Sequence, residues 1–144
     1  MSLTATARLL PGTLRQEVQI GGGRHTLYTD EPEHLGGEDT GPAPHELLPA
    51  ALAACISTTL AMYARTKGWE LGAVSVDVDY DHHATPRRFE IAIRVTGDLS
   101  AEQLARLDKV ARSCPLRRSL EAGSEFAETL EPDPPRLTVV RGAA

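Results

Sequence analysis

The chain has 144 residues, the size of one folding domain, and 41% of them are hydrophobic. The formal net charge is -5 and no basic stripe gathers the 15 Lys and Arg, which argues against a nucleic-acid-binding protein. Residues 1–10 lack the charged head and apolar run of a signal peptide. The longest apolar run, residues 47–56, falls short of the about 20 residues of a membrane-spanning helix. We expect one domain, residues 1–144, in the cytoplasm and without membrane contact.

The amino-terminal part is typical of short strands separated by turn residues. We predict strands over residues 4–9, 14–20 and 25–29, with Pro11-Gly12 in the first turn and Gly21-Gly22-Gly23 in the second. Residues 31–44 are rich in Glu, Gly, Asp and Pro and show no periodicity. This composition predicts a long loop.

Helix-forming residues dominate the segment after Pro44, which suits the first position of a helix. Because Pro49 inside a helix would cost about 3 kcal/mol or more, we predict a short first turn and a main helix starting near Pro49. Lys67 would be its last residue, followed by Gly68 as the stop. The scarcity of charge predicts a helix buried over much of its girth. Spacings of three and four place these residues on one face: Leu48, Leu52, Cys55, Thr59 and Met62.

Strict alternation marks the next two strands, residues 74–80 and 89–95, as a half-buried antiparallel hairpin connected by residues 82–88. Ser100 and Gln103 form a capping box that opens a helix. Cys114-Pro115 interrupts this helix, residues 116–122 restart it, and Gly123 ends it. Two closing strands are predicted over residues 126–130 and 137–140.

The order of strands, helix, hairpin, helix pair and strands predicts an α+β fold rather than an alternating parallel one. The predicted central helix presents more apolar surface than one small sheet can cover. A homodimer that shares sheets around two such helices would bury that surface, and we predict this assembly.

Cys55 and Cys114 are the two cysteines of the chain. Two thiols in a reducing compartment rarely form a permanent bridge, and they are too few for a structural zinc site unless histidines join. Position alone leaves Cys55 open, as a small buried hydrophobe or as a reactive thiol. Cys114 precedes Pro115 at a helix start near several arginines, where the helix dipole and positive charge favour a thiolate. Considered alone, it is also ambiguous.

The residues around both cysteines resemble the motifs of the OsmC/Ohr family, named for osmotically induced protein C and organic hydroperoxide resistance protein. The first motif is matched by Gly41-Pro42-x-Pro44-His45-Glu46-Leu47-Leu48-x-Ala50-Ala51-Leu52-Ala53-Ala54-Cys55. The second is matched by Cys114-Pro115-Leu116-x-Arg118-Ser119-Leu120. Tyr63-Ala64-x-x-Lys67-Gly68-Trp69-x-Leu71 is similar to the family's exit from its central helix. The order of elements agrees along essentially the whole chain.

The resemblance implies an OsmC-like fold: antiparallel sheets wrapped around a buried, cysteine-bearing helix in an intertwined homodimer. It also implies a thiol-dependent peroxidase for organic hydroperoxides, with Cys55 as the peroxidatic thiol and Cys114 as the resolving thiol. The resulting disulfide would be reset by an external dithiol, in relatives often a lipoyl group. An approach lined by Leu48, Leu52 and Met62 would favour alkyl or fatty-acid peroxides over hydrogen peroxide. We expect no cofactor.

One position departs from the family pattern. Relatives place a glutamate directly after the proline, ten positions before the cysteine, where it holds the catalytic arginine. This chain has His45 there, and Glu46 follows one step later. One step along a helix turns a side chain by about 100°, so the resemblance leaves open which of the two takes the role. Arg15 is the predicted activating arginine, and Arg24 is the alternative.

A second class of function is compatible with the same motifs. In a carrier or sensor of this fold, Cys55 would lie in an apolar ligand pocket at the dimer interface without turning over peroxide. The displaced glutamate favours this class, whereas retention of both cysteines favours the enzyme. A metal site is not expected, because His82 and His83, adjacent in a strand, would point to opposite faces.

Overall fold

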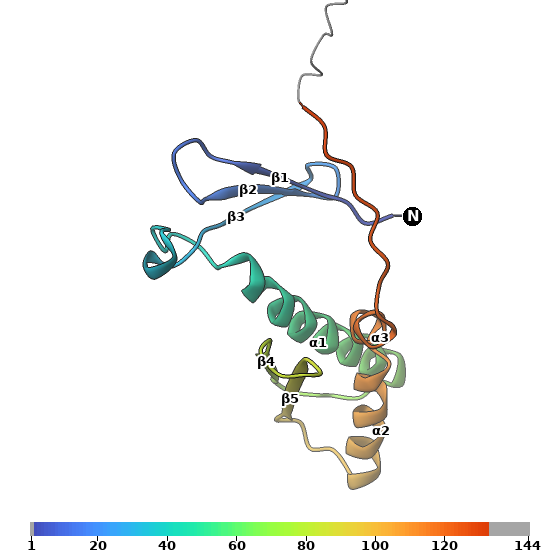
Figure 1. Ribbon diagram of the computed structural model, residues 1–144. Helices are drawn as coiled ribbons and strands as arrows, with labels where there is room; N and C mark the ends of the chain where they lie inside the picture. Colours follow the sequence, from blue (N-terminus) through green and yellow to red (C-terminus); the bar gives the residue numbers. More distant parts are fainter. Residues whose placement is uncertain (1, 133–144) are drawn as a thin grey trace, which may run out of the picture.

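The computed structural model describes residues 2–132, so the predicted strand at 137–140 lies outside the described residues. It has the predicted α+β architecture, with antiparallel sheets and a central helix (Figure 1). A three-stranded sheet forms one end of the molecule. A long helix, a two-stranded hairpin and two shorter helices form the other.

The amino-terminal sheet is an antiparallel meander of β1 (Ala5–Leu9), β2 (Gln16–Ile20) and β3 (His25–Thr29). All three predicted strands are confirmed, but β2 starts two positions later than predicted. The Thr13 hydroxyl explains the delay, because it donates to the Leu10 carbonyl at 2.8 Å and accepts the Arg15 N–H at 3.0 Å. These bonds keep residues 10–15 in the turn.

The loop after β3 is ordered around one buried carboxylate. Asp30 is 2% exposed and accepts the backbone N–H groups of Glu31, Glu38 and Thr40 at 2.9, 3.2 and 3.1 Å. The Thr40 hydroxyl donates a fourth hydrogen bond at 2.8 Å. A short 3-10 helix, η1 (Glu33–Leu35), lies within the loop. Asp30 therefore orders this loop by accepting backbone N–H groups that would otherwise lack an acceptor.

The central helix α1 (Leu47–Lys67) follows a separate 3-10 turn, η2 (Pro44–Glu46). It starts two residues before the predicted position, with Pro49 inside its first turn. A helix has no internal partner for its first N–H groups, so proline removes no hydrogen bond there. Gly68 ends the helix in the left-handed conformation, at φ 68°, as predicted.

The buried face of α1 differs in part from the predicted one. Its fully buried members recur every four residues: Leu52, Ile56, Leu60 and Ala64. Cys55 and Thr59 lie half-buried on the flank of this stripe, whereas Met62 is 65% exposed. The prediction for Met62 was wrong because the stripe follows a four-residue spacing, which leaves this position outside the contact with the hairpin and α2.

The hairpin β4 (Val74–Asp81) and β5 (Arg88–Val95) pairs antiparallel, with Val76 opposite Ile93. Its apolar side packs against the α1 core, while its charged side faces solvent. Helices α2 (Ala101–Arg112) and α3 (Pro115–Ala122) also pack against α1. The predicted capping box is confirmed, because the Gln103 N–H donates to the Ser100 hydroxyl at 3.1 Å and the Ser100 N–H to the Gln103 amide at 2.9 Å.

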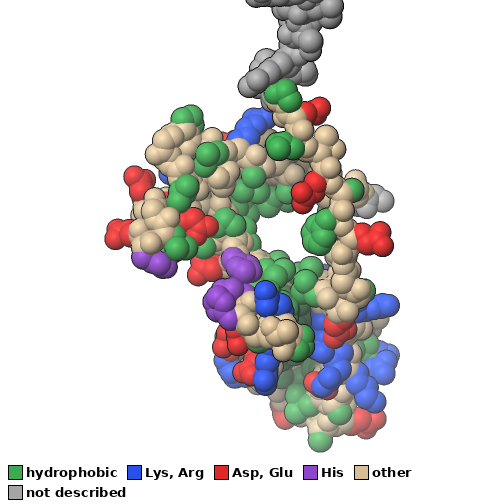
Figure 2. Space-filling view, viewed as in Figure 1, with side chains coloured by type: hydrophobic (Ala, Val, Ile, Leu, Met, Phe, Trp, Pro, Cys, Tyr) green, Lys and Arg blue, Asp and Glu red, His purple; other side chains and the backbone are tan. Residues whose placement is uncertain are grey.

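The predicted strand at residues 126–130 is wrong for this chain. The segment has no secondary structure, and Phe126 and Leu130 are 87% and 101% exposed. A strand forms only by pairing with another, and this segment extends past the amino-terminal sheet without joining it (Figure 1). Figure 2 shows an opening between the two, with apolar side chains along its sides.

The segment Pro44–Lys67 is long and apolar enough to cross a membrane by length and composition alone. Its buried residues pack against the hairpin, α2 and α3 within one apolar core. In this chain, 22% of the most apolar stretch of the segment is buried.

Candidate active site

The two cysteines meet where α1 passes the junction of α2 and α3. Cys55 is half-buried in α1, and Cys114, 0% exposed, is the N-cap residue of α3. Each thiol is among the groups that set the pKa of the other, so the two side chains are neighbours. Both are free thiols in the structure. The chain therefore brings together two residues that lie far apart in its sequence.

The local sequence explains the position of Cys114. The Cys114 N–H still bonds to the Ala111 carbonyl at 3.2 Å at the end of α2, and Pro115 then opens α3. Proline at the first helical position needs no hydrogen bond, so the chain turns at the cysteine without leaving a donor unsatisfied. The first N–H groups of α3 consequently point back toward the thiol pair.

The start of α3 favours negative charge on Cys114. Burial raises the pKa of the Cys114 thiol, but the N–H groups of Arg117 and Leu116 and the Cys55 thiol outweigh burial and leave it below its ordinary value. A helix amino-terminus stabilises an anion through these unpaired N–H groups and the helix dipole. Cys114 is thus the thiol that ionises first.

Cys55 has the opposite tendency. Burial raises the pKa of the Cys55 thiol and the neighbouring Cys114 raises it further, whereas the Leu116 N–H and the Thr59 hydroxyl lower it by less. Two negative charges on adjacent sulfurs repel each other, so a pair of thiols in contact carries one negative charge more readily than two. Within this single chain, the pKa of Cys114 is therefore shifted down and that of Cys55 is shifted up.

Thr59 is a neighbour of both sulfurs to which the sequence analysis assigned no role. Its hydroxyl donates to the Cys55 carbonyl at 2.8 Å and contributes to lowering the pKa of both thiols. The signal in the sequence was the spacing, since a residue four positions after Cys55 lies one turn along the same face.

An open hollow of about 440 Å³ lies beside the thiol pair, between α1, the hairpin and α3. Leu52, three residues before Cys55, and Arg117, three after Cys114, both line it, although neither sulfur does. The remaining lining is mainly apolar: Leu48, Tyr80, Phe89, Ile91 and Leu120, with Arg87 and Glu121. Leu48 and Leu52, two of the residues predicted to line the approach, line this hollow, whereas Met62 does not.

Residues 36–129 match the sequence profile of a family described as OsmC-like proteins. The chain belongs to the OsmC family. Of the solved structures that resemble it, one is assigned to the osmotic stress and detoxification response of Psychrobacter arcticus, at 25% identity and a TM-score of 0.68. The alignment covers 82% of this chain and 87% of that one. No curated protein matches the chain by sequence.

Two further relatives share the fold. An OsmC-like protein from Mycoplasma pneumoniae is 19% identical, with a TM-score of 0.69 over 84% of this chain and 88% of that one. An organic hydroperoxide resistance protein from Legionella pneumophila is 24% identical, with a TM-score of 0.58 over 82% and 88%. The predicted family and fold are thereby confirmed.

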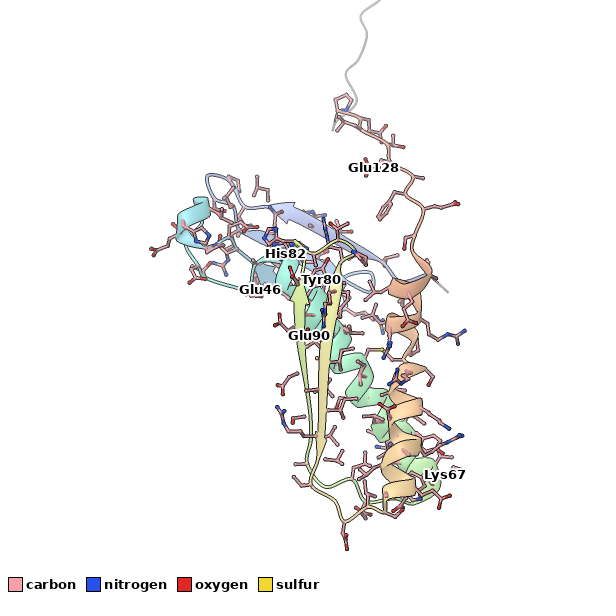
Figure 3. All side chains as sticks on the ribbon, turned by 60° about the horizontal axis from the view of Figure 1, so that its bottom comes forward. Glu46, Lys67, Tyr80, His82, Glu90 and Glu128 are labelled. Atoms are coloured by element: carbon pink, nitrogen blue, oxygen red, sulfur yellow. The ribbon has the colours of Figure 1, made fainter. Side chains whose placement is uncertain are left out.

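The position at which the family carries glutamate is occupied differently here. His45 is exposed, and its ring lies 5.5 Å from that of Tyr80 and 4.8 Å from that of His82. The Glu46 carboxylate accepts the Ala43 N–H at 2.9 Å. Figure 3 shows Glu46, Tyr80 and His82 at the same end of the hairpin, with Lys67 at the far end of α1. Neither His45 nor Glu46 is among the main groups that shift the pKa values of the two thiols.

Arg15 and Arg24, the two predicted candidates for the activating arginine, both lie in the amino-terminal sheet. Arg15 stacks over the Tyr28 ring at 4.7 Å, and its Nε is buried without a hydrogen-bond partner among residues 2–132. Arg24 is exposed and donates to the Gly21 carbonyl at 3.1 Å. The strands of this sheet make their extensive contacts with one another only, so neither arginine approaches the thiols of its own chain.

Within residues 2–132, no group of three or more His, Cys, Asp or Glu side chains is placed to hold a metal ion. His82 and His83 follow the end of β4 at Asp81, and their ring centroids lie 3.9 Å apart, so the prediction that they point to opposite faces of a strand was wrong. The His45 ring lies 4.8 Å from that of His82, and the histidines form a cluster (Figure 2). The chemistry available at this site is that of the two thiols.

Proposed function

We propose that this protein is a cytoplasmic, thiol-dependent peroxidase that reduces organic hydroperoxides. One observation carries the proposal: two free cysteines from distant segments lie against each other beside an apolar hollow. A structural pair of buried cysteines needs neither the helix start behind Cys114 nor a hollow beside it. A peroxidase that closes an internal disulfide needs both.

The first step is the attack of the Cys55 thiolate on a peroxide oxygen. The O–O bond breaks, the alkoxide leaves and takes a proton as the alcohol, and Cys55 becomes a sulfenic acid. Cys55 is the attacking thiol because it is half-buried, whereas Cys114 is 0% exposed. Two electrons pass from the sulfur to the peroxide in this step.

Cys114 then resolves the sulfenic acid. Its thiolate attacks the Cys55 sulfur, the S–O bond breaks, hydroxide leaves and becomes water, and the Cys55–Cys114 disulfide forms. The N–H groups at the start of α3 lower the pKa of Cys114, which favours its nucleophilic form.

An external dithiol, of which a lipoyl group is one chemical form, resets the enzyme. It attacks the exposed side of the disulfide at Cys55 and expels Cys114, the better leaving thiolate. Its second thiol then displaces Cys55, so that the dithiol leaves as a disulfide and both cysteines are reduced. The two electrons given to the peroxide are thereby restored.

The hollow favours organic peroxides over hydrogen peroxide. Its apolar lining, with Leu48 and Leu52 on α1 and Phe89 and Ile91 on β5, suits an alkyl or fatty-acid chain. Similar turnover of hydrogen peroxide and cumene hydroperoxide would count against this preference.

The proposal includes a homodimer, because the single chain leaves apolar side chains and a strand exposed that a second copy could cover. Phe126 and Leu130 are almost fully exposed on an unpaired segment, and β1 is exposed along its whole length. A second copy that pairs with these segments would bury them and bring its Arg15 toward Cys55. There the guanidinium would lower the pKa of a thiol that burial raises.

The reduced protein should be treated with cumene hydroperoxide and its disulfides mapped by mass spectrometry. We expect one Cys55–Cys114 bond per chain and consumption of the peroxide. Cys55→Ser should abolish consumption, and Cys114→Ser should leave one sulfenate per chain that over-oxidises. Unchanged peroxide together with two free thiols would refute the proposal.

A carrier or sensor with the same pocket is the second candidate. The raised pKa of Cys55, which burial causes, and the placement of Glu46 at a turn favour it. Such a protein would bind an apolar ligand in the hollow, and Cys55 would be oxidised once without sustained turnover. Multiple turnovers with a regenerating dithiol would exclude this candidate.

A further inference from the structure

A second hollow, of about 540 Å³, lies between the end of α1 and the first turns of α2. This α1–α2 hollow shares no lining residue with the hollow beside the thiols, so the proposed peroxidase makes no use of it. Figure 3 shows Lys67 at this end of α1, next to α2. Its volume falls within the about 300 to 1,000 Å³ that is typical of small-molecule sites. Aromatic and basic side chains line it: Tyr63, Lys67, Trp69, Arg106 and Lys109.

The turn that ends α1 brings the two aromatic residues together. The Gly68 N–H bonds to the Arg65 carbonyl at 3.3 Å, and the Trp69 N–H bonds to the Ala64 carbonyl at 2.9 Å. These bonds fold the chain back over the last turn of the helix. The Trp69 ring consequently lies edge-to-face with the Tyr63 ring, with the centroids 5.6 Å apart. The two half-buried rings give the hollow an apolar wall.

Basic side chains gather around the same wall. Lys67 Nζ lies 5.7 Å from the Tyr63 ring centroid, and the guanidinium carbon of Arg106 lies 5.6 Å from it. Lys109, three residues after Arg106 on the same face of α2, also lines the hollow. None of the three forms an ion pair within the described part of the chain, although Glu102 lies on the wall as well. A chain with a formal net charge of -5 thus places three basic side chains against one acidic one here.

Arg106 is oriented by a hydrogen bond. Its Nε donates to the Tyr63 hydroxyl at 2.9 Å, which uses one of the five N–H donors of a guanidinium. The outer two nitrogens form no hydrogen bond with residues 2–132. A guanidinium that is fixed at Nε presents these outer donors as a planar pair, which matches the geometry of a carboxylate or a phosphate.

We propose that the α1–α2 hollow binds a small anion that carries an aromatic ring, such as an aromatic carboxylate or an aryl phosphate. The ring packs against Trp69 and Tyr63, and the charged group binds Arg106 and Lys67. An anion offsets the mutual repulsion of the basic side chains. An aromatic ring covers the apolar wall, which a small inorganic anion would leave in water. The two features of the wall together therefore favour a ligand with both groups.

The chain carries its own reporter for this site, because Trp69 is its single tryptophan. Tryptophan fluorescence is followed while the protein is titrated at constant ionic strength with benzoate and with phenyl phosphate. We expect a saturable change with both probes. Acetate and inorganic phosphate carry the charge without the ring, and benzyl alcohol carries the ring without the charge. Each of these three should bind at least about tenfold more weakly. Equal affinity for benzoate and acetate would show that charge alone attracts the anion, and would overturn the proposal.

Substitutions of the basic residues test the site itself. Arg106→Gln should weaken benzoate binding about tenfold, as expected when a charge-assisted hydrogen bond is lost. Lys67→Gln should weaken it as well, and decides the test if circular dichroism shows that Arg106→Gln does not fold. Arg112→Gln is the matched control and should bind like the parent. Arg112 lies on the same helix but outside the hollow, and it pairs with Asp108 at 3.1 Å.

Three further outcomes would overturn the proposal. The first is the absence of a saturable response to both benzoate and phenyl phosphate. The second is benzoate binding that is the same in Arg106→Gln, Lys67→Gln and Arg112→Gln. The third is binding of a hexaglutamate peptide without binding of either aromatic probe, which would assign the hollow to an acidic protein segment. None of these measurements involves peroxide or the thiols, so the result is independent of the proposed peroxidase activity.

Discussion

The carboxylate of Glu46 accepts the backbone N–H of Ala43 at 2.9 Å. This bond closes the 3-10 turn that leads into α1, so Glu46 acts at the entry of the helix. The carboxylate nearest in sequence to the family's glutamate position is therefore engaged with the backbone of its own turn.

Glu46→Ala should lower the free energy of unfolding by about 1 kcal/mol, the usual cost of losing a cap. Thiol titration should be unchanged, because Glu46 is not among the groups acting on either sulfur. Urea unfolding and thiolate absorbance measure the two effects. Glu46→Gln, which keeps an oxygen acceptor, is the control. A titration altered in both variants would contradict this placement and restore Glu46 to the thiol site.

Cys114 should titrate below an ordinary cysteine. In Cys55→Ser the remaining thiol keeps the α3 N–H groups of Arg117 and Leu116 as partners, so its pKa should stay below 9.0. In Cys114→Ser the remaining Cys55 should titrate above 9.0, because burial raises its pKa. Thiolate absorbance of the two variants decides the assignment, and the reverse order would refute it.

The lowered pKa of Cys114 also makes the free energy of unfolding depend on pH. A thiol whose folded-state pKa lies below its unfolded value binds fewer protons when folded, so the free energy of unfolding rises with pH between the two values. For Cys55→Ser we expect this rise as pH increases toward 9.0, the ordinary value for cysteine. Cys55→Ser combined with Cys114→Ser is the control and should lack it. Equal pH profiles for the two proteins would rule out the shift.

Asp30 should make the loop after β3 sensitive to acid. The Thr40 hydroxyl and N–H hold the pKa of Asp30 below its ordinary value of 3.8, with help from the Glu31 and Glu38 N–H groups. Stability from this carboxylate is present above pH 3.8 and is lost as pH falls through its folded-state pKa.

Asp30→Asn should therefore be less stable than the parent at neutral pH, and the difference should shrink in acid. Chemical unfolding at several pH values measures this. Asp39→Asn is the matched control, since asparagine tolerates the positive φ of 53° at that position in the same loop. A difference that is independent of pH would mean that Asp30 acts through shape alone.

Substitutions of Arg15 and of Arg24 distinguish the proposed catalytic arginine from an ordinary surface charge. If Arg15 serves Cys55 across a homodimer, Arg15→Met should slow peroxide reduction at least about tenfold, as expected for a lost charge-assisted contact. Arg24→Met should behave like the parent, because Arg24 only donates to the Gly21 carbonyl. Equal activity of all three proteins, with dimers present by light scattering, would exclude Arg15.

Much of the fold and the two cysteines of the site could be predicted from sequence, because they depend on patterns among residues that are close in the chain. Alternation in β4 and β5, the Ser100 capping box and the Gly68 stop each reflect neighbours within a few residues. The motifs around Cys55 and Cys114 likewise predicted the family, which the match over residues 36–129 confirms. These features are short-range, so a sequence pattern records them directly.

Only the tertiary structure decided which side chains act on the sulfurs. It bonded Thr59 to the Cys55 carbonyl, held Glu46 at Ala43, left Met62 exposed and left residues 126–130 unpaired. Each outcome depends on how α1 packs against α3 and the hairpin, which rotates a side chain toward or away from a partner distant in sequence. The sequence by itself determined that this protein carries a family-typical thiol pair, and packing determined that burial raises the pKa of Cys55 while the N–H groups at the start of α3 lower that of Cys114.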